Sequence, residues 1–422
     1  ADGPLSTKWN NFASVVAGKY KTDNLQIEYS THYSAYDNFS SVNFAAAAGT
    51  AVSKLHNFGA DMNVKFPIAD FMAMEVGAQY NYLGVRPLAG YCATKGFEME
   101  CDSELTNGHI GAAWVQFNVN FTENLKLDAG LKGWAGSFEG TTYWAPDPRI
   151  TLSYEFGKNQ RVFAHYGRYH QYLHKFAAVK GNLPLDYWSL SGADLKPQMA
   201  DSFSAGYSFS GAKWGHSVEL YYKKLNNTAD NTAGMVDLIQ TKFDYMRYCI
   251  QGHGYNTGAD VSLNKESGKL RGYISYSLCF ARRKFDFFCD RWIAASQERR
   301  HTINVVSTYR LSERWMLGAT FMIADGTPYT GAKYVYNLNG SVFPKMTDFN
   351  DCKLPLYHRL DFNVDFKAFQ FGRTHIDLNF SVYNVYAKKN PSLILYRFNT
   401  LEEQQVSLLP WPIPSLNVNI TF

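Results

Sequence analysis

The stretch Leu416-Asn417-Val418-Asn419-Ile420-Thr421-Phe422 alternates apolar and polar side chains along its whole length. Side chains of a β-strand point alternately to its two faces, so this period of two predicts a strand with one apolar and one polar face. Such a strand fits either a soluble sandwich, with a core on its apolar side, or a transmembrane barrel, with lipid there. An aromatic end such as Phe422 is typical of the periplasmic rim of outer-membrane barrels.

The same alternation recurs in Leu125–Lys132, Leu360–Lys367 and His375–Tyr383. We read about 17 strands of this kind along the chain, and no helical segments that could form a second layer over them. A single sheet this large needs a cover for its apolar face. Closing the sheet into a barrel with lipid outside and a wet lumen inside meets this need, so the sequence favours an all-β antiparallel transmembrane barrel.

The connections between these strands alternate between short and long. Short connections rich in Gly, Pro, Asn, Asp and Ser, which close hairpins at low steric cost, are expected at Lys21–Asn24, Pro67–Asp70, Thr122–Asn124, Gly157–Gln160, Gly211–Lys213, Ser267–Lys269, Ser312–Arg314 and Phe371–Arg373. Long connections are expected at about 39–53, 84–108, 138–148, 175–200, 229–254, 283–298, 325–357 and 387–406. Short turns on one rim and long loops on the other are typical of outer-membrane barrels.

Composition agrees with this prediction. Aromatic residues make up 16% of the chain, enough for girdles at two membrane interfaces, and no apolar run is long enough for a transmembrane helix. The formal net charge of +4 is small for 422 residues and gives no reason to expect nucleic-acid binding. The start, Ala1-Asp2-Gly3-Pro4, lacks the features of a signal peptide.

Strand direction gives a further expectation. If Phe422 lies at the periplasmic rim, counting back through about 17 strands makes the first strand, Trp9–Tyr20, also run inward. Single-chain bacterial barrels have even strand numbers and begin on the periplasmic side. The count is therefore wrong by one, or the chain is the C-terminal part of a larger barrel.

From about residue 160 onward, the sequence resembles the barrel of TonB-dependent outer-membrane receptors, particularly the Bacteroidota type. The resemblance rests on the order and spacing of short motifs, namely Leu195–Gln198 (LKPQ), Glu298–Asn304 (ERRHTIN), Tyr309–Leu311 (YRL), Trp315–Gly318 (WMLG), Gly326–Thr330 (GTPYT), Leu354–Asp361 (LPLYHRLD), Ser381–Tyr386 (SVYNVY), Lys389–Pro391 (KNP), Val406–Leu408 (VSL) and Ile413–Ser415 (IPS).

This resemblance implies that residues 1–422 correspond to about strands 6 to 22 of a 22-stranded barrel. The N-terminal plug, the TonB box and the first strands that the family carries would then lie outside this chain, as a second chain, a cleaved fragment or unrecorded sequence. The implied function is capture and import of a scarce solute (a siderophore, haem, a peptide or a glycan) across the Gram-negative outer membrane, driven from the inner membrane. Implied partners are the plug, TonB through that plug, lipopolysaccharide and a surface lipoprotein.

Two other functions remain open: a plugless passive channel, and a surface-binding or scaffolding barrel without transport. An enzyme is not expected, because no Ser-His-Asp grouping, paired carboxylates at a marked spacing or phosphate-binding glycine loop stands out. No cofactor is expected either.

Residues that could bind a solute lie in the expected outer loops and at the lumen mouth. Rigid aromatic side chains bind ligands with little loss of entropy, although they also staple loops together. The densest histidine cluster, with His170 and His174, could ligate iron, but no third ligand or metal-site spacing accompanies it, so lumen lining is favoured and no metal site is predicted. The candidates are Tyr143, Trp144, His170, His174, Trp188, Tyr245, Tyr248, Trp292 and Tyr329.

Three further groups complete the prediction. Asp361, Asp365 and Asp377 share the polar strand face and are expected to solvate the lumen or contact a plug. The six cysteines, which lack a tight CxxC spacing, are expected to staple outer loops, with Cys92–Cys101, Cys279–Cys289 and Cys249–Cys352 as possible pairs. A basic patch around Arg282-Arg283-Lys284, with Arg291, Arg299 and Arg300, could bind lipopolysaccharide phosphates or attract an anionic solute, or could be an ordinary solvated loop.

Overall fold

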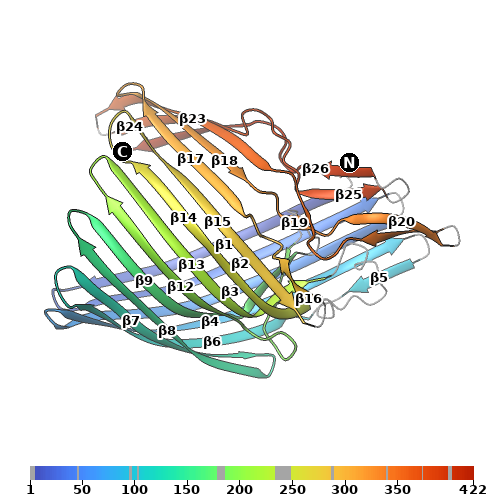
Figure 1. The fold of residues 1–422 in the computed structure, drawn as a ribbon, viewed down its shortest axis with the longest axis horizontal. Coiled ribbons are helices and arrows are strands. Elements are labelled where there is room, and N and C mark those ends of the chain that lie inside the picture. Colours follow the sequence, from blue (N-terminus) through green and yellow to red (C-terminus); the bar gives the residue numbers. More distant parts are fainter. Residues whose placement is uncertain are drawn as a thin grey trace.

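The computed structural model describes residues 5–44, 47–94, 97–101, 104–177, 186–232, 249–286, 289–338, 341–372, 374–397 and 402–422. These residues form strands, turns and irregular segments dominated by one large antiparallel sheet (Figure 1). No helix in this part of the chain is long and apolar enough to span a membrane. The all-β antiparallel architecture predicted from the sequence is confirmed.

Seventeen long strands of the sheet follow one another in chain order, each paired antiparallel with the next. They are β1 (Leu5–Lys21), β2 (Gln26–Phe44), β3 (Ala47–Ala69), β4 (Met72–Thr94), β6 (Thr106–Asn120), β7 (Leu125–Phe138), β8 (Thr141–Phe156), β9 (Gln160–Gln171), β12 (Gln198–Ser210), β13 (Trp214–Asn231), β14 (Cys249–Lys265), β15 (Leu270–Phe285), β17 (His301–Arg310), β18 (Trp315–Ala324), β23 (Tyr357–Phe371), β24 (Thr374–Tyr383) and β27 (Ile413–Thr421).

Shorter strands pair with this sheet or form separate ladders beside it. β5 (Phe97–Cys101) pairs with β4, and β16 (Cys289–Ala294) pairs with β15. Four small two-stranded ladders lie outside it, formed by β10 (Leu173–Ala177) with β11 (Asp186–Leu190), β19 (Pro328–Tyr329) with β22 (Cys352–Lys353), β20 (Ala332–Leu338) with β21 (Ser341–Met346), and β25 (Leu393–Arg397) with β26 (Glu402–Val406).

The eight predicted short turns are confirmed in the described residues, which exclude Arg373 of the last turn, and they share one rim with the end of β27. Each connects two long strands of the sheet directly. Several carry the positive φ that a tight turn requires, as at Gly157, Asn159, Gly268 and Gly372. This is the rim that the sequence analysis expects on the periplasmic side.

Three of the predicted long connections on the other rim are instead largely strand-paired. In the 84–108 segment, β4 continues to Thr94 and pairs with β5, so the prediction of an irregular loop there was wrong. The other two are extended hairpins. β2 and β3 stay paired up to Phe44 and Ala47, and β7 and β8 stay paired up to Phe138 and Thr141. The β7–β8 turn consists of Glu139 and Gly140 with φ of 47° and 82°, a combination that suits the twist of the flanking strands. The predictions of irregular loops at 39–53 and 138–148 were therefore wrong, because strand pairing continues through them.

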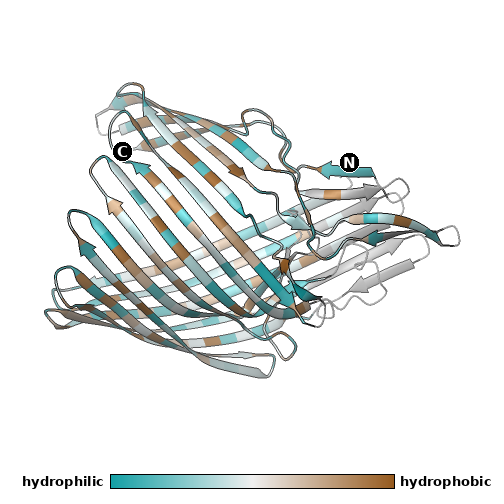
Figure 2. Cartoon of the chain, viewed as in Figure 1, coloured by the Kyte–Doolittle hydropathy of each residue, from teal (hydrophilic) through white to brown (hydrophobic). Residues whose placement is uncertain are grey.

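The two faces of the sheet differ as the alternation predicted. Leu416, Val418 and Ile420 of β27 are exposed on the outer face, and Asn417 and Asn419 point to the inner one. Figure 2 shows apolar and polar residues alternating along the long strands. The sheet curls so that β1–β4 run behind β13–β17 (Figure 1), with β1 and β27 at its two edges and, in the described residues, no pairing that joins them.

The hairpin β10–β11 folds back onto the inner face of the sheet, against β3, β4 and β6. There Leu190 completes an apolar cluster with Leu83, Val85, Ile110, Trp134 and Phe138, all less than a tenth exposed. His174 of β10 is 1% exposed and bonds to Ser191 Oγ at 2.9 Å and to Gln198 Nε2 at 2.9 Å. Burial lowers the pKa of His174 to about 4, so docking of the hairpin requires the neutral imidazole.

Docking of this hairpin should weaken as the pH falls from about 6.5 towards 4. Between about pH 4 and 6.5, the undocked His174 binds a proton while the docked His174 stays neutral. The stability of the docked hairpin therefore rises with pH in this window. We expect protection of the β10 and β11 backbone amides against hydrogen exchange to fall roughly 30-fold between pH 7.5 and pH 5.

His174→Gln, which keeps a polar side chain but does not titrate there, is the matched control. Its protection factors should stay level across the same range. Equal pH dependence in both proteins would contradict this account.

Candidate functional site

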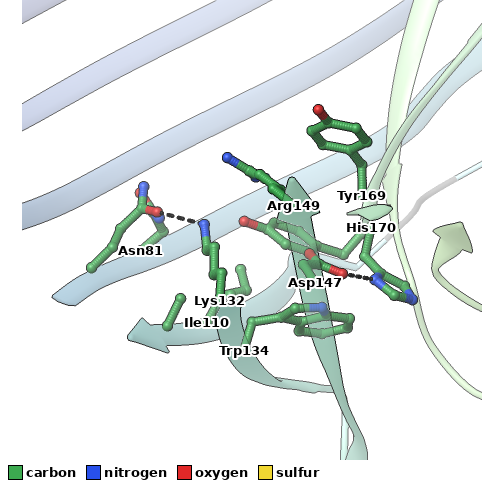
Figure 3. Close-up of a pocket in the computed structure, with 11 residues that line it drawn as sticks. Asn81, Ile110, Lys132, Trp134, Asp147, Arg149, Tyr169 and His170 are labelled. Atoms are coloured by element: carbon green, nitrogen blue, oxygen red, sulfur yellow. Dashed lines mark hydrogen bonds and ion pairs between the residues drawn. The ribbon is translucent and has the colours of Figure 1, made fainter. Parts of the chain in front are cut away.

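A cavity of about 80 Å³ opens on the inner face of β4, β6, β7, β8 and β9, and we call it the lumen pocket (Figure 3). Strand register builds it, because Asn81 lies opposite Ile110, Ala112 opposite Trp134, and Lys132 opposite Asp147. Its lining consists of Gln79, Asn81, Ile110, Ala112, Lys132, Trp134, Asp147, Arg149, Tyr169, His170 and Tyr172.

The best-buried polar contact in the pocket joins Asp147 and His170. Asp147 is 5% exposed, and its Oδ1 lies 2.6 Å from His170 Nδ1. Tyr169 and His170 are adjacent in sequence, yet both line the cavity at the point where β9 ends and the chain turns inward. The contact fixes the position of the imidazole against β8.

Two cations lie beside this pair. Lys132 Nζ donates to Gln79 Oε1 at 3.2 Å, and the Arg149 guanidinium lies 4.9 Å from the centre of the Tyr169 ring. The pocket thus holds two cationic side chains and one carboxylate. This balance favours an anionic group in the cavity.

Aromatic rings form the wall below the charges. The Trp134 ring lies 5.2 Å from the His170 ring and 5.8 Å from the Tyr172 ring, and Figure 3 shows it beneath Asp147 and His170. The buried Trp134 Nε1 has no hydrogen-bond partner among the described residues.

Of the predicted solute-binding residues, the pocket contains His170 alone. His174 and Trp188 lie in the docked hairpin β10–β11, where Trp188 packs against its apolar cluster. Tyr143 donates to the Gly192 carbonyl at 2.9 Å and thereby staples the β7–β8 hairpin to the segment after β11. These positions support loop closure around the pocket.

Other candidates lie away from the pocket. Trp144 is 78% exposed on the outer face of β8, and Trp292 of β16 packs edge-on against Tyr255 at 5.0 Å. Tyr329 lies in β19 opposite Cys352. Tyr245 and Tyr248 lie outside the described residues. Solute binding by these five residues stays a prediction.

The three aspartates lie on the inner face of β23 and β24, on the polar side of the alternation. Asp361 accepts from Arg359 Nε at 3.0 Å and from the Asn384 backbone N–H at 2.9 Å. Asp365 accepts from Asn363 and Asn379. Asp377 lies between Lys367 and Asn419 in register. Contact with a plug stays a prediction.

The cysteines remain a prediction in part. Phe285 pairs with Cys289, six positions along β15 from Cys279, so the register does not bring Cys279 and Cys289 together. Cys279 and Cys352 are thiols in the structure, without disulfides. Cys92 lies opposite Met99, and Cys101 lies opposite Gly90, on neighbouring strands. Among the described residues, no three His, Cys, Asp or Glu side chains gather as metal ligands.

Sequence reasoning missed Lys132, Trp134, Asp147 and Arg149. The alternation of Leu125–Lys132 had already placed Lys132 on the polar face, and extending it by two residues would have added Trp134. Asp147 was hidden by the expectation of a long connection at about 138–148.

Comparison with known proteins agrees with this architecture. A family model described as "TonB dependent receptor-like, beta-barrel" matches residues 3–385. A search of curated protein sequences finds no match.

Among solved structures, the chain is similar to the ferric citrate transporter FecA in its unliganded form (12% identity, TM-score 0.68, 98% of this chain and 62% of that one). It is also similar to the ferric yersiniabactin uptake receptor FyuA from Yersinia pestis (10% identity, TM-score 0.65, 98% and 61%) and to the copper transporter OprC (12% identity, TM-score 0.63, 100% and 66%).

At these identities the similarity shows a shared fold, and the chain spans less than two thirds of the length of these proteins. The family model, by contrast, covers most of the chain. The chain therefore belongs to the family of TonB-dependent receptor-like β-barrels, which lie in the outer membrane of Gram-negative bacteria.

Proposed function

We propose that this chain is the solute-capturing barrel of a TonB-dependent receptor, and that its solute is a metal chelate with an anionic group. The observation that carries the proposal is the lumen pocket, where the two cationic side chains of Lys132 and Arg149 outnumber the single carboxylate of Asp147. The named ligands of FecA, FyuA and OprC, which are two iron chelates and copper, support a metal-containing solute.

The size of the pocket restricts its role to one part of the ligand. A cavity of about 80 Å³ accepts a single functional group such as a carboxylate, whereas sites for whole small molecules are several-fold larger. The rest of the solute would lie in the wider lumen, above the inward-facing Asp361 and Asp365. Charge-assisted hydrogen bonds from Lys132 and Arg149 would then orient it.

The proposal includes a further polypeptide segment with a plug, the remaining strands and the TonB-binding region. Its support is the pair of unpaired sheet edges, β1 and β27, since backbone groups exposed to lipid cost several kcal/mol each. A surface lipoprotein and lipopolysaccharide are further partners in this proposal, and catalysis is not part of it. The passive channel and the scaffolding barrel are the alternatives to it.

Neutralising the pocket cations should weaken solute binding. Lys132→Gln and Arg149→Gln each remove one charge, and we expect the dissociation constant of an anionic ferric chelate to rise about tenfold or more. Binding of radioactive ferric citrate, ferric catecholate and a neutral ferric chelate to intact cells measures the effect. The neutral chelate should be insensitive to both substitutions.

Lys126→Gln is the matched control. Lys126 lies on the same face of β7 nearer the periplasmic rim, in an exposed ion pair with Glu155 at 2.9 Å. Its loss should leave binding within about twofold of the wild type. Equal effects of Lys126→Gln and Lys132→Gln would count against the pocket.

Energy coupling separates the receptor from its alternatives. A protonophore should abolish accumulation of the bound chelate without changing its surface binding. Accumulation that survives the protonophore would favour a passive channel, and binding without accumulation would favour a scaffold.

Intact mass measured on the complex extracted from outer membranes without boiling, and then denatured, tests the further segment. We expect either a second polypeptide in equal amount or one covalent chain heavier than 47.8 kDa. A lone species of 47.8 kDa in a folded, inserted barrel would contradict this part of the proposal.

A further inference from the structure

Asn81 of β4 contributes an uncommitted amide to the lumen pocket. Its side chain lines the cavity and is 7% exposed, yet its amide makes no hydrogen bond in the described part of the chain. The polar atoms of Asn81 are not fully enclosed, unlike Trp134 Nε1. Because buried side-chain amides are nearly always hydrogen-bonded, this donor and acceptor are available to a group inside the cavity.

Strand register explains why the amide has no partner within the barrel wall. Asn81 lies opposite Gly59 of β3 and Ile110 of β6, and neither residue has a polar side chain. A Cβ at position 59 would overlap both Asn81 Oδ1 and the His32 ring, so the glycine makes room for the two side chains. His32 Nε2 already accepts from Asn57 Nδ2 at 3.2 Å. These neighbours therefore offer the amide no hydrogen bond.

Asn81 and Lys132 face the same part of the pocket. Lys132 Nζ donates to Gln79 Oε1 at 3.2 Å, and Gln79 precedes Asn81 by two residues, about 7 Å along the same face of β4. Figure 3 shows Asn81 beside Lys132, on the side of the pocket away from His170. An anionic group bonded to Lys132 therefore brings the next atoms of the ligand to Asn81.

The cavity limits what can accompany the anionic group. A volume of about 80 Å³ holds one functional group with its nearest substituent, whereas sites for whole small molecules are several-fold larger. Ile110 and Ala112 line the same cavity and carry no hydrogen-bonding side chain. The substituent must therefore be small, and its polar contact on this side of the pocket is with Asn81.

A hydroxyl on the carbon next to a carboxylate meets these conditions. The carboxylate accepts from Lys132 and Arg149, and the hydroxyl, which both donates and accepts, pairs with either polar atom of the Asn81 amide. A sulfate group fills the space with charged acceptors and brings no neutral substituent. A carboxylate without the hydroxyl leaves the Asn81 amide desolvated and unpaired, which costs affinity.

We propose that Asn81 is a specificity-determining residue of the lumen pocket, and that the anionic group selected there is an α-hydroxycarboxylate. This inference rests on the proposed function, since it takes Lys132 and Arg149 as the partners of the anion. It adds the neutral half of recognition. The two cations attract a carboxylate, and Asn81 selects the carboxylate that carries an adjoining hydroxyl.

L-malate and succinate test this selection, because they differ by one hydroxyl on the carbon next to a carboxylate. Saturation-transfer NMR on the receptor isolated from outer membranes measures the dissociation constant of each acid. The wild type should bind L-malate about five- to tenfold more tightly than succinate, which is the effect of one hydrogen bond. Equal dissociation constants for the two acids would overturn the proposal.

Asn81→Leu removes the amide and nearly preserves the volume of the side chain. It should reduce the preference for L-malate to within about twofold, while the dissociation constant of succinate stays at the wild-type value. The matched control is Asn304→Leu on the inner face of β17, away from the pocket, which should keep the full preference. A preference that persists in Asn81→Leu would also overturn the proposal.

Lys132→Gln separates this inference from the proposed function. A similar loss of affinity for both acids would show that the pocket binds the carboxylate, and the ratio between the two acids then decides the role of Asn81 alone. Acids that bind equally tightly to the wild type and to Lys132→Gln would contradict the proposed function and, with it, this inference.

Discussion

A hydrocarbon environment offers no hydrogen-bond partner to a peptide group, and this constraint shapes the whole molecule. Fifteen of the seventeen long strands satisfy their backbone groups through a neighbour on each side, whereas β1 and β27 each have one paired neighbour in the described residues. The eight short turns on one rim keep these neighbours consecutive in sequence. Strand alternation follows, because a sheet between lipid and water needs one apolar and one polar face. The lumen pocket derives from this arrangement.

Strand register places the residues of the lumen pocket on the inner face of the sheet. Lys132 lies opposite Asp147 on the inner face of β7 and β8, and Asn81 lies opposite Ile110 on the inner face of β4 and β6. A shift by one residue in either pair would send every side chain to the other face. The lengths of the turns at the periplasmic rim thus determine which side chains face the lumen near the extracellular rim.

The sequence predicted the parts of the fold that depend on local pattern. Alternation in Leu416–Phe422 and the turn residues at Thr122–Asn124 and Gly157–Gln160 act over a few positions, so both strands and turns were found. The prediction for 138–148 was wrong because the structure there depends on pairing with residues distant in sequence. Pro146 and Pro148 pair with Gly133 and Leu131 of β7, but the β8–β9 ladder begins only at Arg149, so prolines are tolerated on that free edge. Asp147 was missed for the same reason, and its contact with His170 depends on where β9 ends, which no local pattern encodes.

The extended β7–β8 hairpin has a consequence for recognition kinetics. Strand pairing reaches Phe138 and Thr141, and the Tyr143 hydroxyl ties the hairpin to Gly192, so this wall of the lumen mouth is rigid before any solute arrives. A flexible loop would have to lose conformational entropy on each encounter, whereas a preformed wall does not. Encounters at this wall should therefore be limited by diffusion and orientation, with discrimination between solutes expressed in how quickly the wrong ones leave.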